Sequence, residues 1–260
     1  MGELGIAVED VFLVRHGESE GNAAYREPDS AYARRVFTRP QWEWRLTPKG
    51  EEQAAATGAW LRDRIPAGPP ACAVSPLTRA VETAALLDLP GSAWQLDLGL
   101  REREWGEWDH LTPERQRAEL ARGEEHPVHW GPPGGESLSD VIHRVRVPLA
   151  ALLAEPARAA VAVSHADTLQ ALAFLLAGHT PGTWTEYYRH TGPVANAGVL
   201  HFTRRHPDTG ALSPHFAWFR TPPGPFRPCP ANPRATSAEL LAEARRVPRI
   251  PRETVPRPVS

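Results

Sequence analysis

The 260-residue chain lacks the features of several specialised protein classes. It has only two cysteines, Cys72 and Cys229, which are far apart and without metal-ligand spacing, and this favours a reducing compartment. No run approaches the roughly 18 apolar residues of a membrane span. The residues from Met1 to Asp10 are acidic and have no positively charged leader region, so no signal peptide is expected. The expected location is therefore the cytoplasm.

The chain also lacks an excess of positive or negative charge. The formal net charge is -2, so no overall field favours nucleic acid or a membrane as a partner. No carboxylate cluster or His/Cys spacing indicates a metal site, and neither a metal nor a cofactor is expected. Internal repeats are also absent. The apolar fraction of 41% is enough for a sizeable core, and the length fits one large domain or two small ones.

Short apolar segments that alternate with helical patterns make up most of the chain. Buried strands are predicted at 11–14, 71–75 and 159–164, with a weaker one at 95–97. Thr47 is a suitable cap for a helix over 48–61, and Ser75 for a helix with Pro76 in its first turn. Other helices are expected at 113–122, from Glu136–Ser137 onward, and at 166–177. Segments 196–202 and 212–219 are expected to form a closing hairpin around a turn at 208–210.

Two segments do not fit this alternation. The stretch from Ala23 to Arg45 is rich in arginine and contains Trp42 and Trp44. It is long for a connection, so it is either a wall or lid over a pocket or a solvated excursion. Its side chains would suit an aromatic or sugar-like group or a second anion, or would simply pack. The organisation expected is a domain over 1–220 and a Pro/Arg-rich tail over 221–260, with one short helix near 237–245.

Polar groups follow three of the predicted strands. Arg15 and His16 follow the first, Arg79 lies in the helix after the second, and His165 follows the third. If the strands are parallel neighbours, these groups converge at one sheet edge, where ligands of α/β proteins bind. An arginine and a histidine are costly to bury without an anion, and helix N-termini after Ser75 and His165 would add N–H donors. The pattern predicts a site for a tetrahedral oxyanion.

Ordered motifs connect these residues to a known family. The chain resembles the histidine phosphatase superfamily, in its phosphoglycerate-mutase-like branch of broad-specificity phosphatases. The matching segments, in the family's order, are R-H-G-E-S-x-x-N from Arg15 to Asn22, L-T-x-x-G-x-x-Q-A from Leu46 to Ala54, S-P-L-x-R-A-x-E-T-A from Ser75 to Ala84, L-x-E-x-x-x-G-x-W from Leu100 to Trp108, G-G-E-S from Gly134 to Ser137, and Ser164-His165. Together they cover roughly residues 11 to 203.

The resemblance implies a role for each matched residue. His16 would be the nucleophile that forms a phosphohistidine. Glu102 would be the general acid and then the base, with Glu104 as its rival. The residues that would hold the phosphoryl group are Arg15, Arg79 and His165, with Asn22, Gly17 and the backbone at Ala166 completing the substrate pocket. Arg79 has one structural alternative, a surface position paired with Glu82.

The implied fold is α/β, a three-layer sandwich whose mainly parallel central sheet has helices on both faces. The implied activity is a metal-independent phosphomonoesterase, a histidine-type acid phosphatase (phosphoric monoester hydrolase), acting on a small phosphorylated metabolite. Two alternatives remain: a mutase, although the region from Trp108 to Gly134 lacks the paired arginines of cofactor-dependent mutases, and an inactive protein that binds phosphorylated ligands. The expected partner is the small phosphorylated substrate, and a homodimer is left open.

Overall fold

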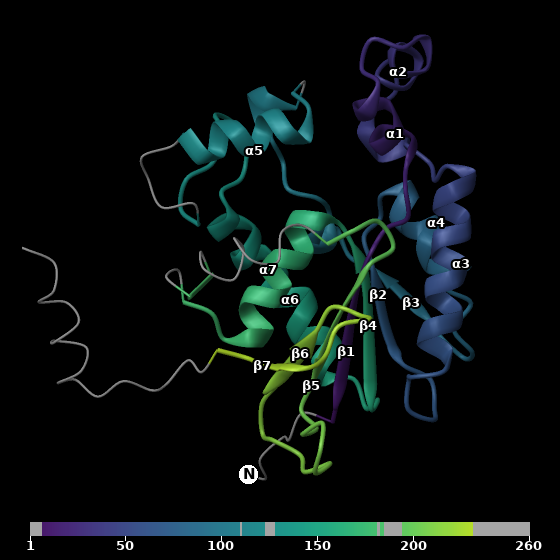
Figure 1. Ribbon diagram of the computed structural model, residues 1–260, viewed down its shortest axis with the longest axis vertical. Coiled ribbons are helices and arrows are strands. Elements are labelled where there is room, and N and C mark those ends of the chain that lie inside the picture. Colours follow the sequence, from purple (N-terminus) through teal and green to yellow (C-terminus); the bar gives the residue numbers. More distant parts are fainter. Residues whose placement is uncertain (1–6, 110, 123–127, 181–182, 185–193, 231–260) are drawn as a thin grey trace, which may run out of the picture. The chain divides into compact units, whose positions relative to one another are not determined.

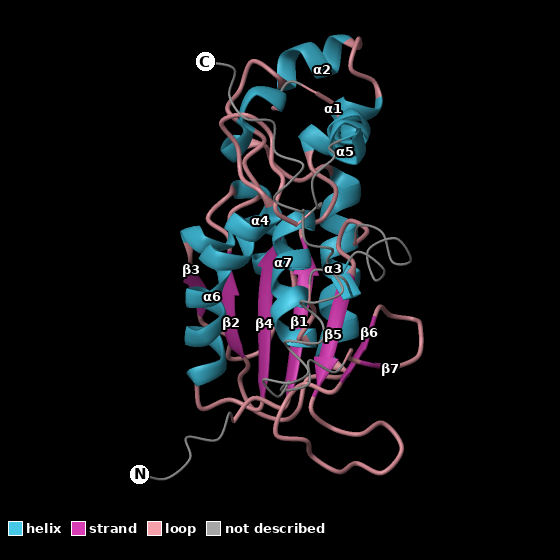
Figure 2. Cartoon of the chain, turned by 90° about the vertical axis from the view of Figure 1, so that its left-hand side faces the viewer, coloured by secondary structure: helices cyan, strands magenta, loops and turns pink. Residues whose placement is uncertain are grey.

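A mixed β-sheet forms the centre of the molecule (Figure 2). The computed structural model describes residues 7–109, 111–122, 128–180, 183–184 and 194–230, all within Met1–Pro230. Its strands run in the order β3-β2-β4-β1-β5-β6-β7. Their bounds are Asp10–Arg15 (β1), Ala71–Val74 (β2), Trp94–Leu96 (β3), Ala159–Ser164 (β4), Val199–Thr203 (β5), Trp218–Arg220 (β6) and Arg227–Pro228 (β7). Strands β3, β2, β4 and β1 are parallel, and β5, β6 and β7 add antiparallel pairings at one side.

Helices cover both faces of this sheet. The main helices are α3 (Pro48–Arg62), α4 (Thr78–Leu86), α6 (Leu138–Ala154) and α7 (Ala166–Ala177). Figure 1 shows α3 and α4 on one side of the sheet and α6 and α7 on the other. The shorter helices are α1 (Glu20–Arg26), α2 (Ala31–Val36), α5 (Pro113–Arg122) and the 3-10 helices η1 (Gln41–Glu43), η2 (Leu98–Leu100) and η3 (Gly106–Trp108). The expected three-layer α/β fold is confirmed.

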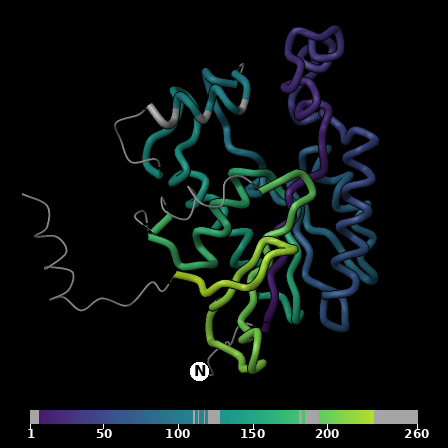
Figure 3. Tube along the Cα trace, viewed as in Figure 1, coloured from purple at the N-terminus to yellow at the C-terminus, as the bar shows by residue number. Residues whose placement is uncertain are grey.

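The period of two along the strands divides the core into two halves. In β1, Val11 and Leu13 point into the cluster that includes α6 and α7, while Phe12 and Val14 point into the cluster of α3 and α4. Strands β2 and β4 divide their side chains in the same way. Because both faces of these strands are buried, their sequences are continuous apolar runs, which is typical of parallel strands. In Figure 3, β1 at the start of the chain lies between β4 and β5 from its second half.

Most helix predictions agree with the structure. The Thr47 hydroxyl accepts a hydrogen bond from the Gly50 amide, so Thr47 caps α3, and Pro48 is the first helical residue. Ser137 and Asp140 form a capping box at the start of α6. The bounds of α5 and α7 are those expected from the sequence.

Two other predictions are wrong in part. The helix expected from Ser75 begins at Thr78, where Leu77 provides no side-chain cap, because the Ser75 hydroxyl is bonded to His165. The turn at 208–210 is present, and Gly210 has a φ of 71°. However, β6 covers only Trp218–Arg220, because the segment before it contains Pro214, which has no N–H for a ladder.

The stretch from Ala23 to Arg45 is mostly helical rather than a solvated excursion. Helices α1 and α2 and the segment after them enclose a small cluster of Ala24, Ala33, Val36 and Trp44. The Trp44 indole N–H donates to the Val36 carbonyl at 3.1 Å, and its ring lies against Gly21, where a Cβ would be 2.1 Å from it. Trp44 therefore has a packing role.

The sheet extends past residue 220, where the boundary between the domain and the tail was expected. Strand β7 follows the Pro222–Pro223 segment and pairs with β6. The rest of the expected tail and its helix near 237–245 lie outside the described residues, so the domain division remains a prediction. Among the helices that the structure describes, none is long and apolar enough to cross a membrane.

Candidate active site

A cavity of about 700 Å³ lies where the carboxyl ends of β1 and β4 meet the start of α7. Arg15 and His16 reach it from the end of β1, Arg79 from α4, Glu102 from the loop after η2, and Ala166 from the start of α7. Residues from the α1, η1, η3 and α5 regions, from the first turn of α7 and from the segment before β5 complete its lining: Ser19, Gly21, Asn22, Tyr25, Arg26, Gln41, Trp44, Trp105, Asp109, Glu114, Gln116, Asp167 and Asn196. The structure therefore brings the strand-end residues together, as the sequence predicts.

His16 is held in one orientation at the bottom of this cavity. Its side chain is only 3% exposed, and Nδ1 donates to the Gly17 carbonyl at 2.7 Å. Because a carbonyl can only accept, the neutral ring has its lone pair on Nε2, which accepts from Arg79 Nε at 3.3 Å. Burial and the charges of Arg79 and Arg15 hold the pKa of His16 well below its ordinary value. The ring is therefore neutral near neutral pH, with its lone pair on Nε2.

Two guanidinium groups flank His16. Arg79 is 5% exposed and donates through Nη1 to the Gln41 carbonyl at 2.9 Å. Burial lowers the pKa of Arg79 to about 10, which leaves it charged at neutral pH. Arg15 donates through Nη1 to the Val194 carbonyl at 2.6 Å. The alternative pairing of Arg79 with Glu82 does not occur, since Glu82 accepts from the Arg45 side chain and the Leu46 amide instead.

His165 lies behind His16, with 5.1 Å between the ring centroids, and is fully buried. Its Nε2 is 2.8 Å from the Ser75 hydroxyl, which also accepts from the Leu77 amide at 3.4 Å. Nδ1 has no hydrogen-bond partner among the described residues. Burial and the Arg79 charge lower the pKa of His165 well below its usual range. Ser75, which sequence reasoning took for a helix cap, therefore orients this ring.

Glu102 and its rival Glu104 lie in different surroundings. Glu102 lines the cavity, and its Oε1 accepts from the Arg103 amide at 2.9 Å. Burial, followed by the charge of Asp167, raises the pKa of Glu102 to about 7. The Glu104 side chain is 59% exposed, is paired with Arg101 at 2.9 Å and is not part of the cavity lining. The geometry therefore favours Glu102 as the proton donor.

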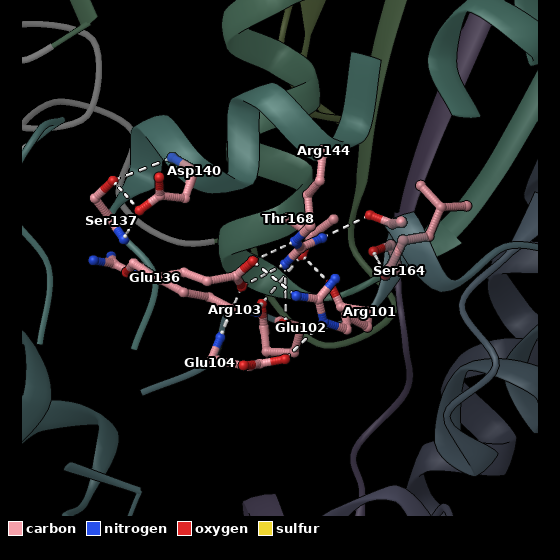
Figure 4. Close-up of polar contacts among 12 residues, drawn as sticks. Arg101, Glu102, Arg103, Glu104, Glu136, Ser137, Asp140, Arg144, Ser164 and Thr168 are labelled. Carbon is pink, nitrogen blue, oxygen red and sulfur yellow. Dashed lines mark hydrogen bonds and ion pairs between the residues drawn. The ribbon is translucent and has the colours of Figure 1, made fainter. Parts of the chain in front are cut away.

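A partly buried ion pair anchors the loop that holds Glu102 (Figure 4). Arg144 of α6 contacts both carboxylate oxygens of Glu136, at 2.7 and 2.9 Å. Its Nη1 donates to the Gly99 carbonyl at 2.6 Å and its Nη2 to the Glu102 carbonyl at 3.1 Å. Glu136 accepts from the Glu104 amide at 3.0 Å and from Arg101 at 2.9 Å. Arg144 thus connects helix α6 to the loop at Gly99 and at Glu102 itself.

This ion pair is stabilised by its hydrogen bonds. Burial disfavours the charged form of Glu136, but the bonds from Arg144 and the Glu104 amide outweigh it and lower the pKa of this carboxyl. The G-G-E-S motif contains Glu136, whereas sequence reasoning missed Arg144. An arginine beside the apolar stripe of Val141, Ile142 and Val145 was the available signal.

Gly17 does not line the cavity. Its amide donates to the Thr83 hydroxyl at 3.0 Å, and a Cβ on it would lie 2.4 Å from the Gly50 carbonyl oxygen of α3. A Cβ on Gly50 would in turn lie 2.0 Å from the Glu18 carbonyl oxygen. The two glycines let the loop after β1 and the first turn of α3 approach closely. The glycine of the R-H-G motif thus has a packing reason, and its contact with substrate remains a prediction.

Asn22 and Ala166 both line the cavity, as expected. Asn22 also belongs to the capping box of α1, and its Oδ1 accepts from Asn196 Nδ2 at 2.9 Å. The same Asn196 amide lies 3.3 Å from the carbonyl oxygens of His16 and Gly17. Asn196 was expected to begin a strand, but Ala197 beside it has a φ of 54°, and β5 begins only at Val199.

The arrangement is suited to phosphoryl transfer. A neutral imidazole nitrogen, two guanidinium groups and a carboxyl group with a pKa of about 7 surround one end of the cavity. Guanidinium groups bind phosphoryl oxygens in a bidentate manner, and an acid of this pKa can protonate a leaving oxygen at neutral pH. Within the described residues, no group of three or more His, Cys, Asp or Glu side chains is placed to hold a metal ion.

Comparison with known proteins gives one family. Residues 11–211 match the model of the histidine phosphatase superfamily (branch 1). A 2,3-bisphosphoglycerate-dependent phosphoglycerate mutase of Beijerinckia indica is 31% identical over 69% of this chain and 86% of its own. A glucosyl-3-phosphoglycerate phosphatase of Mycobacterium tuberculosis is 30% identical over 70% of this chain and 86% of its own. The structure of a mycobacterial glucosyl-3-phosphoglycerate phosphatase with VO3 aligns with a TM-score of 0.59 and 28% identity, over 75% of this chain and 93% of that one.

Proposed function

The chain belongs to branch 1 of the histidine phosphatase superfamily, and on this premise we propose that it hydrolyses a small phosphate monoester without a metal ion. The observation that carries the proposal is the position of His16, whose Nδ1 is bonded to its own loop so that Nε2 faces Arg79 in the cavity. A nucleophile with a fixed tautomer beside two cations is what attack on a dianionic phosphoryl group requires.

In the first step His16 Nε2 attacks phosphorus. A P–N bond forms while the P–O bond to the alcohol breaks, and the Glu102 carboxyl gives its proton to the departing oxygen. Arg15 and Arg79 line the cavity and bind the equatorial oxygens. His165 is fully buried and does not belong to the cavity lining, but it adjoins His16, and its Nδ1 is the further donor proposed for a phosphoryl oxygen. The Ser75 hydroxyl can donate its proton to His165 Nε2, and in this tautomer the ring proton is on Nδ1.

In the second step a water molecule attacks the phosphohistidine. The Glu102 carboxylate takes the proton of the water, the P–N bond breaks, and the electron pair returns to His16 Nε2. Phosphate then leaves and Glu102 is again protonated. A pKa of about 7 supports this double role, because both forms of Glu102 are populated near neutral pH.

Phosphate release from a panel of phosphorylated metabolites in the presence of EDTA tests the proposal. Wild type is expected to release phosphate, and His16→Ala to lose activity by at least about 10⁴-fold, the scale seen when a nucleophile is removed. His215→Ala changes an exposed histidine outside the cavity and is the matched control. Quenching with alkaline denaturant should trap a phosphoprotein in wild type and in the control, and acid treatment should release its phosphate, as expected for a P–N bond. Substantial turnover by folded His16→Ala would refute the mechanism.

A mutase is the second candidate, supported by the 31% identical relative that bears this name. A mutase would return the phosphoryl group to an isomer of the substrate instead of to water. Isomerised product without free phosphate in the same assay would favour it. The cytoplasmic location, supported by two free cysteines, and the homodimer remain predictions.

A further inference from the structure

The segment 194–198, directly before β5, contacts the loop that carries the nucleophile. The Arg15 amide donates to the Gly198 carbonyl at 3.0 Å, and the Ala197 amide donates to the His16 carbonyl at 3.0 Å. These bonds continue the β1–β5 pairing beyond the end of both strands. The backbone of the loop after β1 is therefore held by a segment that lies some 180 positions away in the chain.

The Asn196 side chain is the centre of these contacts. Its Nδ2 lies 2.9 Å from Asn22 Oδ1 and 3.3 Å from the carbonyl oxygens of both His16 and Gly17. Backbone carbonyls only accept hydrogen bonds, so the NH₂ end of this amide must face them. One side chain thus joins the nucleophile loop to helix α1, which carries Asn22.

The Gly17 carbonyl connects Asn196 to the imidazole ring. It accepts the 2.7 Å hydrogen bond from His16 Nδ1 that leaves the lone pair on Nε2, and it also lies 3.3 Å from Asn196 Nδ2. A carbonyl oxygen has two lone pairs, so both donors can bind it at once. The direction of this carbonyl determines which ring nitrogen has the proton, and Asn196 restrains that direction.

Asn196 also restrains the Asn22 side chain. The Ser19 amide, which can only donate, lies 3.1 Å from one end of the Asn22 amide, so this end is Oδ1. Asn196 donates to the same oxygen. With Oδ1 bound to these donors, Nδ2 of Asn22 is the end that can donate to a ligand in the cavity that Asn22 lines.

The backbone beside Asn196 has an unusual conformation. Ala197 has a φ of 54°, in the left-handed region that residues with a Cβ rarely adopt. Its carbonyl accepts from the Thr57 hydroxyl of α3 at 2.8 Å, and the Gly198 amide donates to the Ala195 carbonyl at 2.8 Å. Backbone strain persists where the surroundings enforce it, and it is concentrated at functional sites.

We propose that Asn196 is a positioning residue for phosphoryl transfer: its side-chain amide holds the Gly17 carbonyl, and through it the His16 ring, in line with Asn22. This role rests on the proposed function, since it concerns the attack of His16 on phosphorus. Asn196 acts at the nucleophile, whereas Glu102 acts at the leaving oxygen. Loss of the Asn196 amide should therefore slow different phosphate monoesters by the same factor.

Steady-state kinetics with two esters test this role. For Asn196→Ala, kcat/KM is expected to fall about 10- to 100-fold, the scale of a misplaced reacting group, and equally for glycerol 3-phosphate and p-nitrophenyl phosphate. Asn196→Leu has nearly the same volume but no donor and should lose as much. Activity retained by Asn196→Leu, or a loss confined to one ester, would contradict the proposal. Gln95→Ala, which removes an exposed amide of β3 outside the lining, is the control.

The His16 tautomer provides a measurement that a packing role would not change. In protein labelled with ¹⁵N-histidine, ring nitrogens with and without a proton have separate chemical shifts, and His16→Ala identifies the His16 signals. Asn196→Ala is expected to shift the tautomer ratio at neutral pH about fivefold toward a proton on Nε2, the scale of one hydrogen bond. An unchanged ratio in folded Asn196→Ala would overturn the proposal.

A second variant applies if Asn196→Ala does not fold. Thr57→Val removes only the hydroxyl that binds the Ala197 carbonyl, and it should lower kcat/KM about three- to fivefold for both esters and shift the tautomer ratio in the same direction. No change in either quantity would refute the positioning role. If wild type releases phosphate from neither ester, the proposed function fails instead, and the tautomer ratio still decides whether Asn196 positions His16.

Discussion

The phosphoryl end of the cavity and its outer wall are built in different ways. At the phosphoryl end, His16 and Arg79 are buried, and a backbone carbonyl accepts a hydrogen bond from each. The outer wall is the part of the lining from Trp105 to Gln116, together with Asp167. In this wall Asp109 and Glu114 are exposed, Asp109 directly after the short helix η3 and Glu114 in α5. Buried groups anchored to the sheet keep the geometry that chemistry needs. Exposed groups on short helices can set selectivity with little effect on the core.

Among the substitutions that test the difference between the two regions, the largest loss of turnover is expected at Glu102. Glu102→Gln removes the proton donor, so turnover of alkyl phosphates should fall by about 10²- to 10³-fold. p-Nitrophenyl phosphate should lose less, because its phenolate needs no proton to leave. Steady-state kinetics on both substrates measure the difference. An equal loss on both would assign the acid role to another group, and Glu104→Gln is the matched control.

A smaller effect is expected for the ion pair behind the site. Arg144→Met leaves the partly buried Glu136 with Arg101 and the Glu104 amide as its remaining partners, and the free energy of unfolding should fall by about 1 to 2 kcal/mol, less than when a fully buried pair is broken. The kcat for alkyl phosphates should also fall, since Gly99 and Glu102 lose their anchor. Denaturant unfolding and kinetics measure both effects.

Arg146→Met provides the comparison for this variant. Arg146 lies on the same helix but is exposed, so its replacement should change stability by less than about 0.5 kcal/mol. Similar losses in the two variants would mean that the ion pair does not support the Glu102 loop.

The smallest effect concerns pH and connects the two regions. Glu102 must be protonated to act as an acid, so kcat for alkyl phosphates should fall as the pH rises above about 7. The Asp167 charge raises the pKa of Glu102, and Asp167→Asn should therefore move this limb to lower pH by roughly one unit. A pH–rate profile measures the shift. An unchanged limb would show that the outer wall does not influence the acid.

The expected and observed positions of individual residues show what local sequence patterns can predict. His16 and Arg79 follow apolar runs, and the alternation of strands and helices was enough to bring them to one sheet edge. Ser75 could not be assigned, because its partner His165 lies 90 positions away and only the β2–β4 pairing brings the two together. Gly17 was assigned to the ligand, but the neighbour that requires a glycine is Gly50 of α3.

The sequence by itself determined the four parallel strands, most helix bounds, the family and the residues expected at the phosphoryl end, because these depend on short-range periodicity, capping and ordered motifs. Only the tertiary structure decided which carboxylate faces the cavity, how Arg144 holds it and which side chains line the cavity. Those properties depend on burial and on contacts between distant segments, which raise the pKa of Glu102 to about 7 and leave Glu104 exposed. No single stretch of sequence contains that information, because desolvation and charge proximity arise only when the chain has folded.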